Sequence, residues 1–394
     1  MVQTRSSAQS RDKEIHVVTG GGGFPGFSLA KYLARKGHHV KLIDVKEPVW
    51  DLEANMEFIK GSICDDNQLQ SVVEGASAVY HMASYGMSGR EQLNKKLIEK
   101  VNIGGTEAVL KACLSQDVTR LVYTSTYNVV FGGQEILDGD ERLPYLTDDK
   151  FTDHYSKTKM LAEKKVLASN GAKTSGGATL RCCVLRLAGV YGPGELRHLP
   201  RIVSYLEQGL VKVTYGPRES LVDFLHVDNL VQAHALAAEG LTEGRSYVAA
   251  GRAYFISDDK PVNNFEFFRP LFEGLGYGYP AVNLPFLPVF YFAWLTEIVH
   301  YIVSTVYNFQ PILTRTEVYK TGVTHYFSVQ RARTDLGYSP TVQNDLSQVV
   351  TYYKKLGRVK GHQSMPLLFY FVNAIIIFII YSIFMHVLPR VTTD

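Results

Sequence analysis

Short apolar runs alternate with segments of helical spacing over the first half of the chain. Ile15–Thr19 and His39–Val45 are strand-like runs, and Phe27–Lys36 between them places apolar residues at helical intervals. Further strand-like runs follow, each separated from the next by a helical segment: Phe58–Lys60, Ala78–His81, Leu121–Ser125 and Cys183–Leu187. Strands that alternate with helices predict an α/β fold with a Rossmann-type, doubly wound parallel sheet.

The pattern becomes less regular beyond about residue 190. Gly, Pro and aromatic residues are frequent there, and Asp228–Glu239 is a helical segment. We predict an NAD-binding domain over 14–190, to which later segments near 222–258 return, and a smaller substrate lobe over 191–360. Residues 1–13 are polar and are predicted to be disordered.

The last part of the chain is strongly apolar. Residues 367–388 contain no Asp, Glu, Lys or Arg. As a helix this run would be about 33 Å long, which matches a hydrocarbon core of about 30 Å and predicts a transmembrane helix. Four basic residues between 354 and 360 precede it, and Arg390 alone follows it. The positive-inside rule then predicts a tail-anchored, single-pass protein with a cytosolic body, and we expect the endoplasmic reticulum as its membrane.

A second apolar segment, residues 284–307, is rich in aromatic side chains and has Glu297 as its only charge. Two interpretations stay open. The segment is either a buried helix pair that lines the substrate pocket or a segment that lies in the membrane interface. A full span is disfavoured because an acid is costly at bilayer depth.

Composition and charge narrow the range of partners. The chain has 46% hydrophobic and 20% charged residues, which is ordinary for a globular protein. The net charge is only +3 and no long basic run occurs, so nucleic acid is not a predicted partner. The four cysteines lack the paired spacing of a zinc site. We therefore expect buried, reduced thiols and no metal site.

A glycine-rich turn joins the first strand to the first helix. Its spacing Gly20…Gly23…Gly26 is typical of dinucleotide binding. The first glycine lets the chain turn off the strand, the second lets the backbone approach a pyrophosphate, and the third lets the helix pack closely on the sheet. The phosphates then lie at the amino end of a helix.

Asp44 ends the second strand, 24 residues after Gly20. A carboxylate at this place can hold both hydroxyls of the adenosine ribose, and it repels a 2′-phosphate. We therefore expect NAD rather than NADP. Lys46 lies close enough to weaken that preference, and a solvated Asp that begins a turn is the alternative interpretation.

Tyr155 and Lys159 stand four residues apart, so on a helix they share one face. Moving a tyrosine pKa from about 10 to near 7 takes roughly 4 kcal/mol, and one cation about 4 Å away supplies about that much. Tyr155 can then relay the proton of an alcohol while a hydride leaves for the cofactor. Such a pair is common on helix surfaces, and it gains meaning only together with the glycine turn. A third group is expected in the hydroxyl-rich run 123–127 at a strand end.

These residues together resemble the extended short-chain dehydrogenase/reductase family, and within it the 3β-hydroxysteroid dehydrogenase branch. The family's TGxxGFxG is similar to residues 19–26, its YxxxK to residues 155–159, and its Rxx-G-x-YGPG to residues 186–194. Four longer runs also resemble one particular member of that branch nearly residue for residue: 84–94, 191–205, 261–270 and 308–328.

The resemblance implies a Rossmann-type domain, NAD(P) and a sterol-like or other hydrophobic alcohol or ketone. It also implies that Tyr155 is the proton acceptor and that Lys159 is a cofactor ligand, with Asn102 on the neighbouring helix. Phe24 and Arg186 join the expected cofactor-binding residues because they belong to the matching motifs.

The chain departs from the family pattern at two useful places. Thr126 stands where a second Ser is usual, so we expect Thr126 to be the third catalytic member, with Ser125 as the reserve. The usual Gly-Asp on the adenine side is Gly61-Ser62, so that contact is expected to fall to Asp65 or to the backbone.

The leading hypothesis is a membrane-anchored, NAD-dependent oxidoreductase that acts on a sterol-like substrate, with membrane lipid as a second partner. A homodimer stays open. One alternative is a sugar-nucleotide epimerase or dehydratase, against which the apolar segment 284–307 argues. The other is a membrane-tethered protein that binds NAD as a ligand or redox signal.

Overall fold

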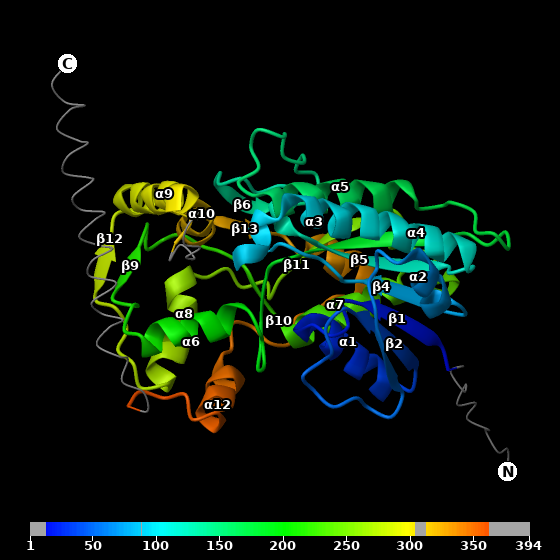
Figure 1. The fold of residues 1–394 in the computed structure, drawn as a ribbon, viewed down its shortest axis with the longest axis horizontal. Coiled ribbons are helices and arrows are strands. Elements are labelled where there is room, and N and C mark those ends of the chain that lie inside the picture. Colours follow the sequence, from blue (N-terminus) through cyan, green and yellow to red (C-terminus); the bar gives the residue numbers. More distant parts are fainter. Residues whose placement is uncertain (1–12, 88, 304–312, 362–394) are drawn as a thin grey trace, which may run out of the picture. The chain divides into compact units, whose positions relative to one another are not determined.

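The computed structural model describes residues 13–87, 89–303 and 313–361. It divides into two compact units (Figure 1). Within the described ranges the first unit comprises 13–191, 223–261 and 325–344, and the second comprises 192–222, 262–324 and 345–361.

A seven-stranded sheet forms the centre of the first unit. Its strands lie in the order β11-β7-β5-β4-β1-β2-β3, and all neighbours are parallel. Their bounds are β1 (Ile15–Thr19), β2 (His39–Asp44), β3 (Met56–Lys60), β4 (Ala78–His81), β5 (Arg120–Thr126), β7 (Arg181–Leu187) and β11 (Ala253–Ile256). The strand order reverses between β1 and β4, as in a doubly wound sheet, which confirms the predicted Rossmann-type fold.

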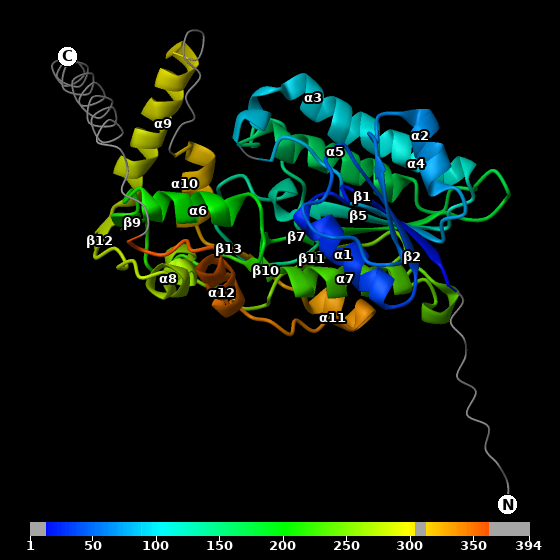
Figure 2. The same ribbon diagram turned by 60° about the horizontal axis from the view of Figure 1, so that its bottom comes forward.

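Helices cover both faces of this sheet (Figure 2). One face carries α1 (Phe24–Arg35) and α7 (Val227–Glu239), and the other carries α2 (Asp66–Val73), α4 (Gly105–Ser115) and α5 (His154–Ala168). Successive strand residues point to opposite faces, so Val18 packs in the cluster under α1, and Val17 packs in the cluster under α2 and α4. Both faces are buried, which explains why these strands are nearly continuous apolar runs.

The remaining elements of the first unit are short. They are α3 (Lys95–Glu99), a π-helical turn (Lys100–Gly104), the paired strands β6 (Ile136–Gly139) and β13 (His325–Phe327), the paired strands β8 (Gly189–Tyr191) and β10 (Phe224–His226), α11 (Gln330–Leu336), and 3-10 turns at Gly89–Leu93, Tyr127–Val129 and Glu243–Arg245. The predicted substrate lobe 191–360 contains 325–344, which the structure places in the first unit. The sequence does not predict that this segment rejoins the first unit. Its strand β13 pairs with β6, almost two hundred positions earlier, and so distant a pairing leaves no local pattern.

The first helix begins three residues earlier than the hydrophobic spacing predicts. Gly23 is its N-cap and Pro25 lies in its first turn. Proline suits that position, because the first N–H groups of a helix have no partner within the helix. The predicted glycine turn therefore overlaps the helix.

The second unit combines one pair of parallel strands with helices. The strands are β9 (Val213–Tyr215) and β12 (Val282–Leu284), and the helices are α6 (His198–Glu207), α8 (Asn264–Gly274), α9 (Phe286–Val303), α10 (Arg315–Gly322) and α12 (Ser347–Lys355). Helix α9 buries Val289 and Ala293 with Val318 of α10. Its other face exposes Leu287, Tyr291 and Trp294, with exposed fractions of 62%, 60% and 44%.

Within residues 13–87, 89–303 and 313–361, no helix is both long and apolar enough to cross a membrane. The transmembrane helix predicted at 367–388 lies outside the described residues, as do residues 1–12 of the segment predicted to be disordered.

Candidate active site

The turn between β1 and α1 brings three backbone segments into close contact. Gly20 has a left-handed backbone, with φ +73°. A Cβ at Gly22 would lie 2.0 Å from the carbonyl oxygen of Lys46, and one at Gly26 would lie 2.4 Å from that of Gly20. The turn therefore tolerates no side chain at these positions. At Gly23 the nearest atom to such a Cβ is 3.3 Å away.

No side chain caps the amino end of α1. Its N-cap, Gly23, offers no side chain, and its first turn contains no acid. The first N–H groups and the helix dipole favour an anion at such an end. The glycine turn and this helix end together fit the pyrophosphate of a dinucleotide.

Asp44 lies directly beside this turn. One carboxylate oxygen accepts from the Gly22 N–H at 3.1 Å, and the other accepts from the Lys46 N–H at 3.1 Å. These two hydrogen bonds fix the orientation of the carboxylate at the end of β2. Asp44 is therefore placed as a ribose ligand would be.

Two other expected cofactor residues have structural contacts. The Phe24 ring is buried and lies 6.1 Å from the ring of Trp50. Asp65 caps α2, where its side chain accepts from the Gln68 N–H at 3.1 Å. Only the backbone of Phe24 lies at the helix end, whereas the exposed Asp65 keeps its second oxygen for another contact.

Helix α5 carries the Tyr-Lys pair. Asp153 caps it by accepting from the Ser156 N–H, which places Tyr155 in the first turn and Lys159 one turn later. Both side chains are buried. The Nζ of Lys159 donates to the Thr124 carbonyl at 2.6 Å, so the ammonium group lies at the carboxyl end of β5.

Burial dominates the electrostatics of Lys159. It lowers the pKa of Lys159 to about 7, against the carboxylate of Glu163, which raises it. The Nζ also lies 4.1 Å from the centre of the Tyr123 ring, an arrangement that favours a cation. Burial therefore opposes the charge of Lys159, while Glu163 and the Tyr123 ring favour it.

Thr126, the last residue of β5, has its hydroxyl oriented by Asn128. The Thr126 oxygen accepts from the Asn128 side-chain amide at 3.0 Å and from the Asn128 backbone N–H at 3.3 Å. A hydroxyl has two lone pairs and one proton. With both lone pairs engaged, Thr126 is left as a donor, which suits a group that holds a substrate oxygen.

Ser125 points the other way. Its hydroxyl donates to the buried carboxylate of Glu163 at 2.5 Å. Glu163 also accepts from Tyr145 at 2.9 Å and pairs with Arg186 at 2.7 Å. Successive strand residues face opposite sides, so Ser125 and Thr126 cannot serve one site equally. The structure places the reserve residue Ser125 in a buried ionic cluster.

Arg186 belongs to the same cluster. Its guanidinium lies over the rings of Tyr145 and Phe255 and lines a cavity of about 560 Å³ together with Glu141 and Arg331. The structure therefore brings Arg186 together with Glu163, and not with the glycine turn or Asp44. The prediction that Arg186 binds the cofactor rests only on the sequence motif at residues 186–194.

Asn102 lies in the π-helical turn and has a positioning contact with α5. Its oxygen accepts from the Tyr85 N–H at 2.8 Å, and its amide donates to the Tyr85 carbonyl at 3.0 Å and to Thr158 at 2.9 Å. The side chain is buried. Asn102 thus joins the loop after β4 to the residue that precedes Lys159.

A buried histidine extends this network to the glycine turn. The Thr106 hydroxyl donates to the Asn102 carbonyl at 2.7 Å, so its oxygen accepts from Nε2 of His81 at 2.9 Å. Nδ1 of His81 then accepts from the Thr19 hydroxyl at 2.8 Å. Burial, with a smaller contribution from Lys159, lowers the pKa of His81 to about 3. This ring is a neutral connector.

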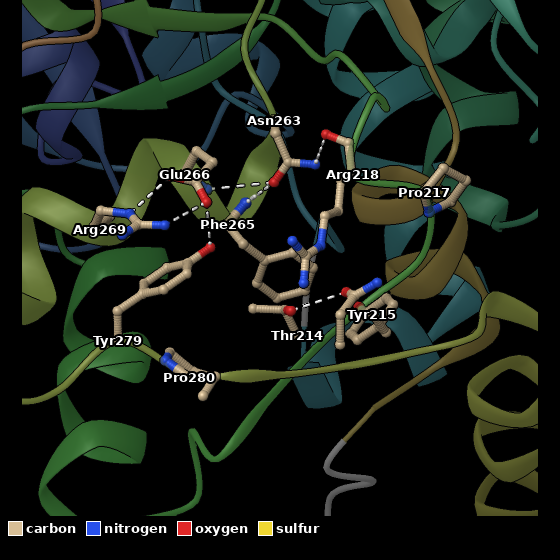
Figure 3. Close-up of a pocket in the computed structure, with 12 residues that line it drawn as sticks. Thr214, Tyr215, Pro217, Arg218, Asn263, Phe265, Glu266, Arg269, Tyr279 and Pro280 are labelled. Carbon is tan, nitrogen blue, oxygen red and sulfur yellow. Dashed lines mark hydrogen bonds and ion pairs between the residues drawn. The ribbon is translucent and has the colours of Figure 1, made fainter.

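The second unit contains a cavity of about 340 Å³ next to β9 and β12 (Figure 3). Tyr215, Phe265 and Tyr279 contribute aromatic side chains to its lining. Glu266 is paired with Arg269 at 2.7 Å and accepts from Tyr279 at 2.9 Å. Among the residues whose side chains the structure describes, those of α9 do not line this cavity.

Comparison with known proteins now adds to this geometry. Residues 17–286 match the model of the 3-beta hydroxysteroid dehydrogenase/isomerase family. The chain belongs to that family. It is thus a member of the short-chain dehydrogenase/reductase oxidoreductases, as the motifs predict.

Relatives match most of the length of this chain. The chain is 56% identical over 352 residues to short-chain dehydrogenase/reductase family 42E member 1 of Danio rerio, which covers 89% of this chain and 91% of the relative. It is 53% identical to the Homo sapiens protein of the same name, over 89% of this chain and 90% of the relative. A 3 beta-hydroxysteroid dehydrogenase/Delta 5-->4-isomerase of Mycobacterium tuberculosis is 35% identical, over 86% of this chain and 90% of the relative.

Solved structures agree on the fold. An epimerase from Methanothermobacter thermautotrophicus has a TM-score of 0.68 at 22% identity and covers 87% of this chain and 93% of its own. A dTDP-glucose 4,6-dehydratase from Streptomyces venezuelae has a TM-score of 0.65 at 20% identity, over 86% of this chain and 97% of its own.

The sequence patterns did not predict several residues that contact the candidate active site of this chain. Asn128, which orients Thr126, follows it by two positions, and Glu163 lies four positions after Lys159 on the same helix. These short spacings could have indicated that Asn128 lies near Thr126 and that Glu163 lies near Lys159. His81 and Thr106 offered none, because their hydrogen bond joins two elements that only the folded sheet brings together.

Proposed function

We propose that this chain is an NAD-dependent dehydrogenase that interconverts a secondary alcohol and a ketone on a steroid or sterol-like substrate. One observation carries the proposal. Lys159, one helical turn after the buried Tyr155, donates to the Thr124 carbonyl of β5, and the same strand ends in Thr126, whose hydroxyl is left as a donor. The names of the relatives support the steroid class of substrate.

Thr126, Tyr155 and Lys159 each have a separate role in the proposed reaction. In the oxidation direction the Thr126 hydroxyl donates a hydrogen bond to the substrate oxygen. Tyr155 takes the hydroxyl proton as the C–H bond breaks and the C=O bond forms. Lys159 contributes positive charge that favours the phenolate form of Tyr155. The glycine turn and Asp44 would hold a nicotinamide dinucleotide, which would supply the hydride acceptor for this direction and the hydride donor for the reverse.

The chain's own groups also support the choice of cofactor. Asp44 is held beside the glycine turn by two backbone N–H groups. Its carboxylate would accept hydrogen bonds from ribose hydroxyls and would repel a 2′-phosphate, which favours NAD.

We further propose that the enzyme works at a membrane, where an apolar substrate is found. The exposed apolar face of α9 supports an interfacial position for residues 284–307. Glu297, the acid of this segment, is paired with Arg315: its oxygens accept from the Arg315 backbone and guanidinium, each at 2.7 Å. The apolar run 367–388 supports a tail anchor.

The test is NADH formation by the detergent-solubilised full chain over a panel of 3β-hydroxysteroids. Tyr155→Phe removes the proton acceptor, so we expect kcat to fall by roughly 10² to 10⁴. Tyr32→Phe, which makes the same change on the outer surface of α1, is the matched control and should keep full activity.

Unchanged turnover in Tyr155→Phe would overturn the mechanism. Tight NAD binding without turnover of any sterol would instead favour a binding protein. Turnover of a sugar nucleotide alone would favour an epimerase or dehydratase.

A further inference from the structure

Three potential metal ligands gather at the amino end of β1, away from the proposed active site. They are Glu14, His16 and His38, and one ligand atom from each lies within 4.8 Å of the others. The glycine turn leaves the opposite, carboxyl end of the same strand. Gly20 follows His16 by four positions, about 13 Å of extended chain.

The backbone holds these residues in register. The His39 N–H donates to the Glu14 carbonyl at 3.0 Å, and Ile15 pairs with His39 in the parallel ladder. Gly37 has a φ of +95° and ends α1 just before His38. The carboxyl end of a helix favours positive charge nearby.

Glu14 fixes the orientation of the His16 ring. One carboxylate oxygen lies 3.1 Å from Nε2 of His16, and the other accepts from Arg120 at 2.7 Å. A carboxylate only accepts hydrogen bonds, so Nε2 carries the proton of this bond. In the neutral ring the lone pair is then on Nδ1.

That lone pair is buried. His16 is 3% exposed, and among the described residues none hydrogen-bonds to its Nδ1. A buried acceptor without a donor destabilises the fold, so a ligand that pairs with it is favoured. A carboxylate that holds one nitrogen of a histidine while the other nitrogen is unmatched is the arrangement of a metal-ligating histidine.

The His38 ring lies beside the His16 ring. The rings of His16 and His38 have centroids 4.5 Å apart. Ligands of a tetrahedral ion with bonds of about 2.1 Å lie about 3.4 Å from one another. The ligand atoms of Glu14, His16 and His38 lie within 4.8 Å of one another, so they would move closer together on binding an ion.

We propose that His16 and His38, with Glu14 as a ligand or as the carboxylate that orients His16, form a structural site for Zn²⁺ or a similar transition-metal ion. Two imidazoles favour such ions. Mg²⁺ and Ca²⁺ need several oxygen ligands, and Arg120 offsets the single carboxylate of this site. The ion would join the start of β1 to the turn before β2.

The test is a calorimetric titration of the untagged full chain in detergent with ZnCl₂, with thermal unfolding measured in the presence of Zn²⁺ or of a chelator. One Zn²⁺ should bind per chain and raise the melting temperature. His38→Gln should weaken binding at least tenfold, and Glu14→Gln should weaken it roughly 10- to 100-fold. His39→Gln, next in sequence but paired with Glu57, is the matched control and should bind as the parent does.

The inference fails if no Zn²⁺ binds to the folded chain, or if His38→Gln and His39→Gln bind it equally well. Circular dichroism of each variant without metal shows that a loss of binding does not come from unfolding. Retained dehydrogenase activity in His38→Gln would agree with a structural site. Equal binding of Mg²⁺ and Zn²⁺ would contradict the ligand chemistry.

Discussion

At the scale of single residues, Thr126 illustrates how a neighbour sets the role of a hydroxyl. Asn128 supplies two N–H groups to the Thr126 oxygen. The Thr126 hydroxyl can therefore still donate its proton in a hydrogen bond. A hydroxyl oriented in this way stabilises charge that develops on a substrate oxygen.

Thr126→Ala should lower kcat by roughly 10²-fold, because one oriented donor is lost where charge develops. Thr126→Ser keeps the hydroxyl and should recover most of the rate. The measurement is steady-state NADH formation with the best substrate of the steroid panel. Equal rates for Thr126→Ala and the parent would remove Thr126 from the mechanism.

Asp223 is a second informative residue, since its carboxyl group is buried in the first unit. Burial, followed by the repulsion of Asp259 and Asp258, raises the pKa of Asp223 to about 8. The Phe327 N–H donates to one of its oxygens at 2.8 Å. The folded chain therefore binds a proton here that the unfolded chain has released above pH 4.

The stability contributed by this proton is present at low pH and is lost as pH rises from about 4 through 8. Asp223→Asn keeps the acceptor for Phe327 and removes the titration. Its free energy of unfolding should fall less steeply than that of the parent between pH 5 and 8, by up to roughly 1.4 kcal/mol per pH unit. Urea unfolding at several pH values measures this, and parallel curves would contradict the assignment.

At the scale of elements, the turn from β1 to α1 depends on how closely the chain approaches β2. Gly22 lies against the carbonyl of Lys46, and its N–H binds Asp44. Gly22 and Lys46 thus shape the turn, and their N–H groups also orient Asp44, the expected ribose ligand. A change at Gly22 should act on both.

Gly22→Ala places a Cβ 2.0 Å from the Lys46 carbonyl oxygen, so the backbone must shift. We expect a loss of about 1–3 kcal/mol in stability and NAD binding at least tenfold weaker. Gly244→Ala is the control, since the nearest atom to a Cβ there is 4.0 Å away. Thermal unfolding and NAD titration by fluorescence would show the difference, and equal affinity in both variants would contradict it.

At the scale of the molecule, the two apolar segments bear on where the enzyme works. Helix α9 buries one stripe against α10 and exposes another. The pairing of Glu297 with Arg315 neutralises the acid that made this segment unsuited to an apolar environment. Attachment by 367–388 is the stronger of the two proposed contacts, since a transmembrane helix inserts almost irreversibly.

Removing residues 362–394 should move most of the protein from the carbonate-washed membrane fraction to the supernatant. Any remaining attachment should fall further when Leu287, Tyr291 and Trp294 are all replaced by Ser. Fractionation followed by immunoblotting measures both effects. Full retention of the shortened chain with the three Ser replacements would contradict both contacts.

The sequence by itself determined the sheet, the glycine turn, the position of Asp44 at a strand end and that of the Tyr-Lys pair on one helix, because each depends on local spacing. Strands buried on both faces are apolar along their length, and residues four apart share a helix face. Element ends were less certain. Pro25 lies in the first turn of α1, and Thr126 still belongs to β5.

Only the tertiary structure separated the surroundings of the two candidate hydroxyls. Ser125 and Thr126 are adjacent, but the pleat sends Ser125 to Glu163 and leaves Thr126 with Asn128. The meeting of Glu14, His16 and His38 also depends on strand pairing, which joins the start of β1 to the turn before β2. Contacts between segments distant in sequence leave no periodic pattern along the chain, and this is why sequence patterns did not reveal them.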